Sequence, residues 1–224
     1  MRKYVFYYFS LLITLVVASC AELTEPVTLP SSMTLERHDV TLMVGDLCVI
    51  HPVFIPDSLS NNTVFWMTDN PEVATFIMGD TLLGVSPGKT NAIAIAVTDY
   101  NKIDTCAVEV IERWTLPEED FPHETIVYAN VVVHGEPATD DHIIAAFIGG
   151  EVRGIGEMFE MRGHSVMRIR IHGDFVEPDE MDVQSVTLRC YTRSKHLLET
   201  FDYWLYFDGE THGTPSAPVR LEIR

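Results

Sequence analysis

Residues 64–75 read VFWMTDNPEVAT, a short run of β-forming residues that stops at the turn Asp69-Asn70-Pro71. Similar runs, each bounded by Gly, Pro, Asn or Asp, precede and follow this one along the chain: 41–44, 92–97 and 106–110. Short strands at this regular spacing, with no helical period, predict a β-sandwich over residues 33–111.

Cysteines occupy two positions that this sandwich is expected to bury. Cys48 shares its parity with Ile50 and Phe54, so the three side chains should lie on one face of a strand, and Cys106 falls on the inward side of the run 106–110. In an exported chain Cys48 and Cys106 could form a disulfide; the alternative is two separate buried thiols. Pro52 interrupts the same strand and predicts an edge or a bulge, because proline donates no ladder hydrogen bond.

The order of motifs in this region carries a resemblance. The sequence runs through Val44-Gly45-Asp46, the stretch 66–75, the stretch 83–90 and the closing strand 106–110. This order resembles the group 2 bacterial immunoglobulin-like domain. The resemblance implies a spacer or adhesion module outside the cytoplasm, without catalytic residues. It also implies that Trp66 is a core residue and not a sugar-stacking platform.

The N-terminus predicts export. Arg2-Lys3 precedes the apolar run 4–17, which is too short to span a membrane and reads as a secretory signal. Val17-Ala18-Ser19-Cys20 then resembles a bacterial lipobox. That resemblance implies cleavage before Cys20 and a lipid on its thiol; the alternative is an ordinary signal peptide with an unrelated cysteine. We therefore expect a signal peptide over 1–19 and a lipidated tether over 20–32. Together they imply an anchor in the outer membrane of a Gram-negative bacterium of Bacteroidetes type, with the cell surface favoured over the periplasm.

A second β-domain is expected after an acidic linker. The linker spans 112–123 and contains Trp114, which we expect between the domains. Residues 124–224 then show β-forming runs with turn signals between them, and predict a second sandwich or jelly-roll: 125–134, 143–148, 166–172, 186–191, 201–207 and 219–223. His134-Gly135-Glu136 and the stretches 144–154 and 213–221 resemble a β-module of unassigned function found in Bacteroidetes surface proteins. The fold class predicted for the whole chain is all-β, with two tandem β-sandwich domains after a lipoprotein signal peptide.

The most aromatic stretch, YWLYF at 203–207, predicts a ligand site. Trp204 and Tyr206 share one face of a strand, while Tyr203, Leu205 and Phe207 share the other. If the first face is outward, the two rings form a platform on which sugar C–H groups can stack. The alternative is burial of these rings in a core or against the first domain. Arg153 could bind an anionic sugar, or it could pair with Glu151, two positions before it.

The composition of the chain and the motifs it lacks argue against several classes of function. The net charge is −18, and removal of residues 1–19 takes away Arg2, Lys3 and no acid, leaving −20. Such a chain lacks the cationic surface that nucleic-acid binding requires. The sequence contains no Gly-x-Ser-x-Gly, Walker or His-Glu-x-x-His motif and no EF-hand loop, so we predict no enzyme activity, metal or cofactor. We predict a non-enzymatic envelope lipoprotein, attached to the membrane through Cys20, that serves as an adhesion or glycan-binding module. The alternative is a structural or assembly component that binds another envelope protein.

Overall fold

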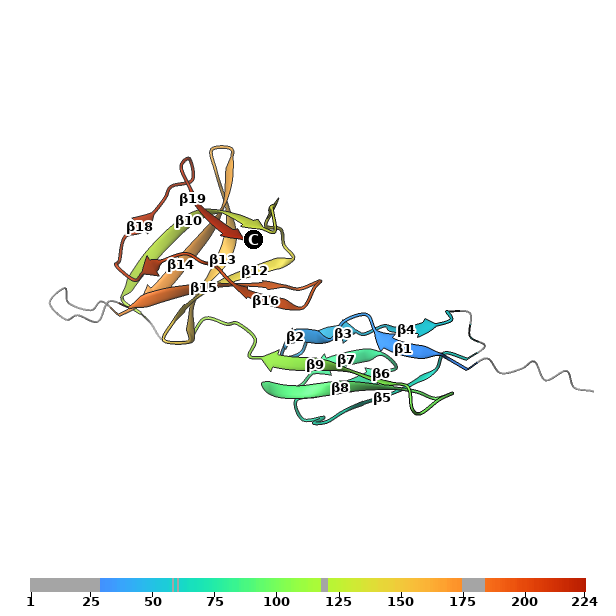
Figure 1. The fold of residues 1–224 in the computed structure, drawn as a ribbon. Coiled ribbons are helices and arrows are strands. Elements are labelled where there is room, and N and C mark those ends of the chain that lie inside the picture. Colours follow the sequence, from blue (N-terminus) through green and yellow to red (C-terminus); the bar gives the residue numbers. More distant parts are fainter. Residues whose placement is uncertain (1–28, 58, 60, 118–120, 175–183) are drawn as a thin grey trace, which may run out of the picture.

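The computed structural model describes residues 29–224 except 58, 60, 118–120 and 175–183. Within this described part every regular element is a β-strand. The strands form two β-sandwiches that follow one another along the chain and lie end to end (Figure 1). The fold is therefore all-β, as predicted. The expected signal peptide and Cys20 lie outside the described residues.

The first sandwich contains nine strands: β1 (Ser32–Leu35), β2 (Asp39–Met43), β3 (Leu47–Val49), β4 (Pro52–Ile55), β5 (Val64–Thr68), β6 (Ala74–Met78), β7 (Thr81–Gly84), β8 (Gly88–Ala96) and β9 (Ile103–Ile111). One sheet has the order β2-β9-β8-β5 and the other β3-β7-β6, with β1 and β4 as a separate pair. β2 runs parallel to β9, while β9, β8 and β5 are antiparallel neighbours.

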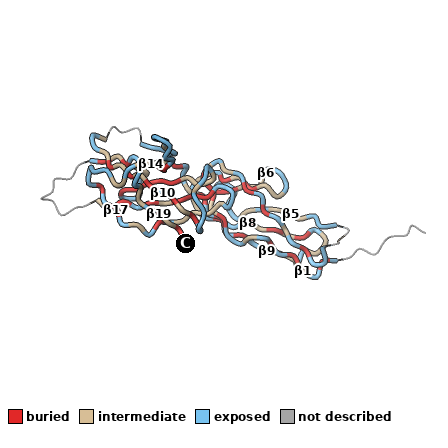
Figure 2. Tube along the Cα trace, turned by 90° about the horizontal axis from the view of Figure 1, so that it is seen from above, coloured by how far each residue is buried: buried red, intermediate tan, exposed pale blue. Residues whose placement is uncertain are grey.

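Buried and outward-facing side chains alternate along the strands, and the buried ones form the core of this sandwich. Ala92, Ala94 and Ala96 on β8 are fully buried, and the residues between them face outward or are only partly covered. Figure 2 shows the resulting interior as a line of buried segments along the molecule. Trp66 packs against this core, with its ring centroid 4.9 Å from that of Phe76. Trp66 is thus partly buried against the core, as expected for a packing residue.

Residues 47–55 differ in two respects from what the sequence predicts. Pro52 does not interrupt a strand: β3 ends at Val49, and Pro52 is the first residue of β4, which pairs only with β1. A strand can begin with proline because its missing N–H is not needed there. Cys48 and Cys106 are both buried in the same core, on opposing sheets, and both are free thiols in the structure. The Cys48–Cys106 disulfide is therefore not present in it.

The second sandwich contains ten strands: β10 (His123–Val133), β11 (Glu136–Pro137), β12 (His142–Ile148), β13 (Glu151–Met161), β14 (His164–Gly173), β15 (Ser185–Thr192), β16 (Leu197–Thr200), β17 (Leu205–Tyr206), β18 (Thr211–His212) and β19 (Val219–Ile223). Their main path is β11-β10-β14-β13-β12-β15-β16; β17 pairs with β15, and β18 and β19 pair with β10.

Strand β13 joins the two layers of this sandwich. Its first half pairs with β12 and its second half with β14. Gly154 and Gly156 lie where the strand passes from one neighbour to the other, and a Cβ on Gly154 would lie 2.4 Å from the carbonyl oxygen of Arg170. Only glycine permits this close backbone approach.

The segment 112–117 connects the two sandwiches, and Trp114 packs between them. Its ring lies edge-on to Phe147 at 5.4 Å and to Tyr191 at 6.4 Å, measured between centroids. Trp114, Phe147 and Tyr191 form one buried cluster with Met43 and Ala145, which we call the junction cluster. Because this cluster draws on both sandwiches and the linker, the two domains are docked against each other.

Candidate functional site

The aromatic stretch at 203–207 lies on the surface of the second sandwich. Trp204 is 83% exposed and Tyr206 45%, while Leu205 and Phe207 are 4% and 8% exposed. Tyr203 packs against the core from the same side as Leu205 and Phe207. The split of the five side chains by parity is as predicted. The expected strand is shorter, however, because only Leu205 and Tyr206 pair with β15.

A hollow of about 250 Å³ adjoins Trp204. Its walls include four exposed polar side chains, from β15, from the end of β16 and from the segment after it: Ser185, Thr187, Thr200 and Asp202. Within the described residues none of these four side chains has a hydrogen-bond partner. The hollow therefore presents three hydroxyl groups and one carboxylate beside an exposed indole.

Arg153 is engaged in contacts within the chain. Its guanidinium Nη2 lies 2.9 Å from Oε2 of Glu151, and its Cζ lies 4.1 Å from the ring centroid of Phe121. The Arg153 side chain is only 15% exposed. The Arg153–Glu151 pairing predicted from the sequence is present. Arg153 is not among the residues that line the hollow beside Trp204.

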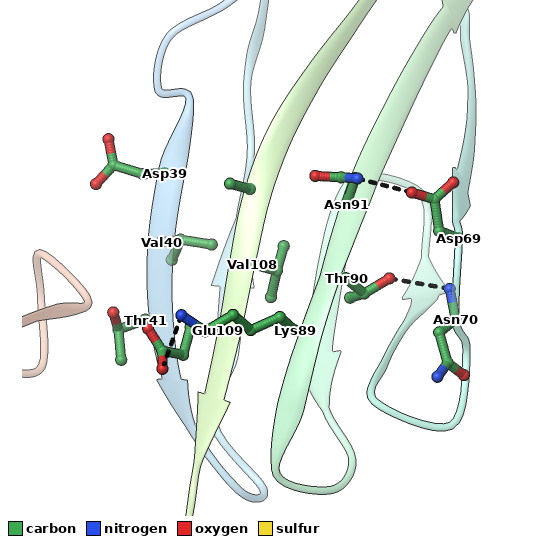
Figure 3. A pocket seen from close by; sticks show the side chains of 11 residues that line it. Asp39, Val40, Thr41, Asp69, Asn70, Lys89, Thr90, Asn91, Val108 and Glu109 are labelled. Atoms are coloured by element: carbon green, nitrogen blue, oxygen red, sulfur yellow. Dashed lines mark hydrogen bonds and ion pairs between the residues drawn. The ribbon is translucent and has the colours of Figure 1, made fainter.

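A second hollow, of about 520 Å³, lies on the outer face of the first sandwich (Figure 3). Ala107 on β9 forms part of its floor, between Asp39 on β2 and Asn91 on β8. Its polar groups are largely paired: Asn91 donates to Asp69 at 2.7 Å, and Lys89 lies 3.5 Å from Glu109. No aromatic side chain is among the described residues that line it. It is thus less suited to a stacked ligand than the hollow beside Trp204.

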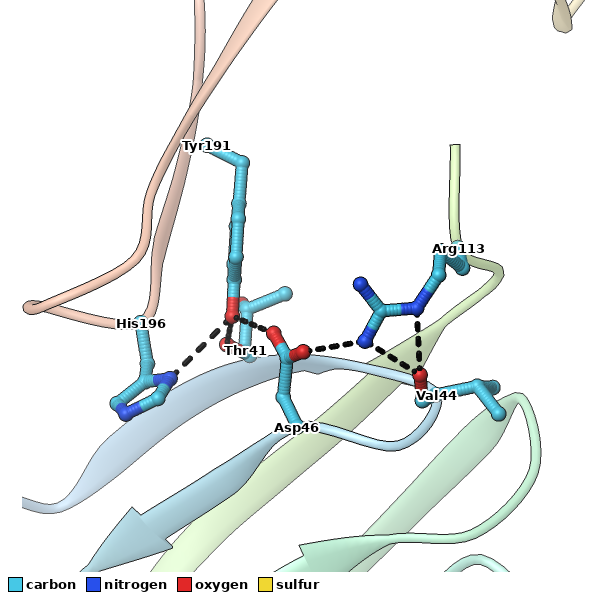
Figure 4. Close-up of polar contacts among 6 residues, drawn as sticks. All are labelled: Thr41, Val44, Asp46, Arg113, Tyr191 and His196. Carbon is cyan, nitrogen blue, oxygen red and sulfur yellow. Dashed lines mark hydrogen bonds and ion pairs between the residues drawn. The ribbon is translucent and has the colours of Figure 1, made fainter. Parts of the chain in front are cut away.

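A polar cluster that the sequence did not predict surrounds the junction of the two sandwiches (Figure 4). The hydroxyl of the buried Tyr191 lies 3.0 Å from Asp46 Oδ2 and 3.2 Å from both the Thr41 carbonyl oxygen and His196 Nδ1. Arg113 in the linker donates to the other Asp46 oxygen at 2.6 Å. A backbone bond from Thr41 N–H to the His196 carbonyl oxygen, at 2.9 Å, also crosses the junction.

Burial shifts the pKa values of two groups in this cluster. Loss of solvation raises the pKa of Tyr191, and the negative charge of Asp46 adds to that rise, so the phenol remains a hydrogen-bond donor. Burial lowers the pKa of His196, with Arg37 acting in the same direction. The phenol of Tyr191 and the imidazole of His196 are therefore both uncharged at neutral pH.

No helix among the described residues has the length and apolar character needed to cross a membrane. In the same part of the chain, no group of three or more His, Cys, Asp or Glu side chains is arranged to hold a metal ion.

Comparison with known proteins gives likeness in fold only. No protein-family model matches the sequence, and a search of curated proteins gives no match. Among solved structures, domains 4–9 of the surface-layer protein SbsC are 14% identical with a TM-score of 0.32; the alignment covers 83% of this chain and 32% of that one.

Two further solved structures align over a similar share of this chain. The Bacteroides ovatus mixed-linkage glucan utilization protein SGBP-B, in complex with a heptasaccharide, is 10% identical with a TM-score of 0.26, covering 82% of this chain and 48% of that one. The Escherichia coli adhesin FdeC is 13% identical with a TM-score of 0.28, covering 83% and 66%. At these values the similarity carries no argument about function.

Proposed function

We propose that this chain is a non-enzymatic cell-surface lipoprotein whose second sandwich binds a neutral glycan at Trp204, Tyr206 and the adjoining hollow. Cys20 carries the lipid that anchors it in the outer membrane. The first sandwich, with its resemblance to group 2 bacterial immunoglobulin-like domains, is a spacer between the anchor and the binding face.

The exposure of Trp204 is the observation that carries the glycan-binding proposal. Fully burying a large apolar side chain contributes about 1.5–3 kcal/mol, and Trp204, at 83% exposure, does not make that contribution to folding. Its neighbours Leu205 and Phe207 supply the core contacts of this segment. The indole is thus available to a ligand without cost to the fold.

The groups around Trp204 indicate the chemistry of the ligand. An indole face packs against the C–H groups of a sugar ring, and hydroxyl and carboxylate groups exchange hydrogen bonds with sugar hydroxyls. Ser185, Thr187, Thr200 and Asp202 offer such groups on one side of Trp204. Among the described residues that line the hollow, Asp202 is the only charged one, and the whole chain has a net charge of −18, so a neutral glycan fits better than an anionic one.

The docked junction supports the spacer role of the first sandwich. A spacer positions a binding face only if it does not fold back or swing freely. The junction cluster and the hydrogen bonds of Tyr191 and Thr41 fix the second sandwich on the end of the first.

A glycan array tests the proposal. The chain from Ala21 onward is applied to neutral and anionic glycans, with Trp204→Ala and Tyr100→Ala as matched variants that each remove an exposed aromatic side chain. A saturable signal on neutral glycans that Trp204→Ala abolishes and Tyr100→Ala retains supports the proposal. A folded protein with no signal would favour the alternative, an assembly component that binds another envelope protein.

A further inference from the structure

Exposed apolar side chains gather at the end of the first sandwich farthest from the second. The chain enters the sandwich at this end, at the start of β1, and β8 turns into β9 here (Figure 1). Phe65, Ile95 and Ile103 form a row across β5, β8 and β9, in which Phe65 pairs with Ile95 and Ile95 with Ile103. Val97 and Tyr100 lie in the turn between β8 and β9, next to this end of the strands. We call these five residues the pole patch.

The core of the sandwich does not require the pole patch. Phe65 is 56% exposed, Ile103 53% and Tyr100 70%, while Ile95, between Phe65 and Ile103, is partly buried. Ala94 and Ala96, the neighbours of Ile95 on β8, are fully covered. Single exposed apolar residues are common, but a contiguous group on one end of a domain indicates a contact surface.

We propose that the pole patch contacts the lipid surface to which the chain is anchored; this inference rests on the lipid at Cys20 in the proposed function. Leu29 lies nine positions after Cys20, and nine fully extended residues span at most about 32 Å. Ser31 N–H bonds to the Ile55 carbonyl oxygen at 2.7 Å, which places the entry of the chain against β4 at this same end. The lipid therefore holds this end of the molecule near the membrane.

The composition of the surface around the patch suits a neutral interface. Leu29 and Ile55, beside the entry of the chain, are 57% and 59% exposed and add to the apolar area. Tyr100 presents an apolar ring with a polar tip, the type of side chain enriched at membrane–water interfaces. Asp99 and Lys102 flank it in the turn and offset each other in charge. The net charge of −18 opposes anionic lipids and favours zwitterionic headgroups.

Such a contact would give the anchored protein a defined orientation. Attachment at the single point Cys20 does not by itself fix how the first sandwich is turned at the membrane. Insertion of the pole patch into the interface turns that end toward the lipid and leaves the second sandwich, with Trp204, toward solvent.

An environment-sensitive dye in the β8–β9 turn tests the contact. The chain from Ala21 onward carries an N-terminal histidine tag and is held on phosphatidylcholine vesicles that contain a nickel-chelating lipid. The dye is attached at Asn101→Cys, beside Tyr100, or at Glu160→Cys in the second sandwich as a control position. The artificial tether makes the test independent of whether Cys20 is lipidated, which the mass of the exported protein decides separately.

Two double variants distinguish a contact made by the pole patch from nonspecific adsorption of exposed apolar side chains. Phe65→Thr with Ile103→Thr removes two patch residues, and Leu47→Thr with Val85→Thr removes two similarly exposed residues near Asp46, at the other end of the sandwich. We expect a blue shift and an increase in emission at position 101 only on vesicles, lost in the first variant and retained in the second.

Three results would overturn the inference. The first is unchanged emission at position 101 on vesicles, and the second is an equal change in the patch variant. The third is a dimer of the untethered chain in sedimentation that the patch variant dissociates, because the patch would then bind a second copy of the chain.

Discussion

The phenol oxygen of Tyr191, on β15 of the second sandwich, lies 3.0 Å from the carboxylate of Asp46, in the β2–β3 turn of the first. The same carboxylate accepts a hydrogen bond from Arg113 in the linker. Asp46, in the first sandwich, thus contacts both the linker and the second sandwich. Substitutions that remove a single hydrogen-bonding group can therefore test the junction.

Tyr191→Phe removes only the hydroxyl and keeps the ring that packs on Trp114. We expect a loss of about 1.5 kcal/mol in the free energy of unfolding, at the lower end for a hydrogen bond to a charged group, because Asp46 retains Arg113. Small-angle scattering should show a wider range of interdomain distances. Tyr100→Phe, which alters a 70% exposed residue, is the control and should change neither quantity. Equal stability and scattering of Tyr191→Phe and wild type would contradict the role of this contact.

Trp114→Ala removes the centre of the junction cluster. Replacing a buried tryptophan by alanine typically costs about 3–5 kcal/mol, and here the loss falls on the contact between the sandwiches. We expect calorimetry to resolve two unfolding transitions in this variant, because each sandwich retains its own core. Trp204→Ala should leave the wild-type unfolding profile unchanged. A Trp114→Ala profile identical to wild type would show that the junction does not couple the domains.

The carboxyl group of Asp104 makes the stability of the first sandwich depend on pH. Partial burial acts to raise its pKa, but hydrogen bonds from the backbone N–H groups of Leu35 and Thr105 and from His38 lower it overall. Because the folded pKa lies below the usual value of 3.8, this stabilisation is complete above that value and is lost as pH falls through the folded pKa.

Asp104→Asn should therefore destabilise the protein by about 1 kcal/mol at pH 7 and reduce the difference in stability between pH 7 and pH 3. Denaturant titrations at both values measure this. Glu72→Gln, at an exposed position, is the matched control. A pH dependence in Asp104→Asn as steep as that of wild type would refute the assignment.

The three described cysteines should react slowly while the protein is folded. Burial raises the pKa of Cys48, and it raises the pKa of Cys106 and of Cys190 to about 12. The reactive thiolate is therefore scarce at pH 8. We expect a coloured disulfide reagent to leave the folded protein unlabelled and to label those of the three that are free thiols only after unfolding. Rapid labelling of any of them in the native protein would contradict this burial.

The Cys48–Cys106 disulfide stays a prediction for the exported protein. The two side chains face one core from opposing sheets, although both are free thiols here. A disulfide would lower the mass of the exported chain by two hydrogens and leave only Cys190 of the three to be labelled after unfolding.

The sequence predicted what depends on local pattern. The resemblance to the immunoglobulin-like domain implied that Trp66 is a core residue. Alternation divided the stretch 203–207 into two faces, because side chains on a strand alternate between faces, and left open which face is outward. It did not predict β13: Gly154 and Gly156 resemble turn residues in the sequence, and their actual role depends on the backbone of β14.

Contacts between residues far apart in the chain could not be predicted from the sequence either. Trp114 could be expected between the domains because it lies in the linker. The hydrogen-bond partners of Tyr191 could not be expected, because Asp46 and Thr41 lie about 150 positions earlier. They meet Tyr191 only when both sandwiches are formed. The hollow beside Trp204 likewise depends on the return of residues 200–204 alongside β15.

Calorimetric titration of the folded chain with a neutral oligosaccharide from the array decides whether Trp204 binds a glycan. We expect saturable binding that weakens by about tenfold or more in Trp204→Ala, as for an exposed aromatic residue that dominates a contact, with an unfolding temperature equal to that of wild type. Unchanged affinity in Trp204→Ala, or loss of the folded state in that variant, would contradict glycan binding through Trp204.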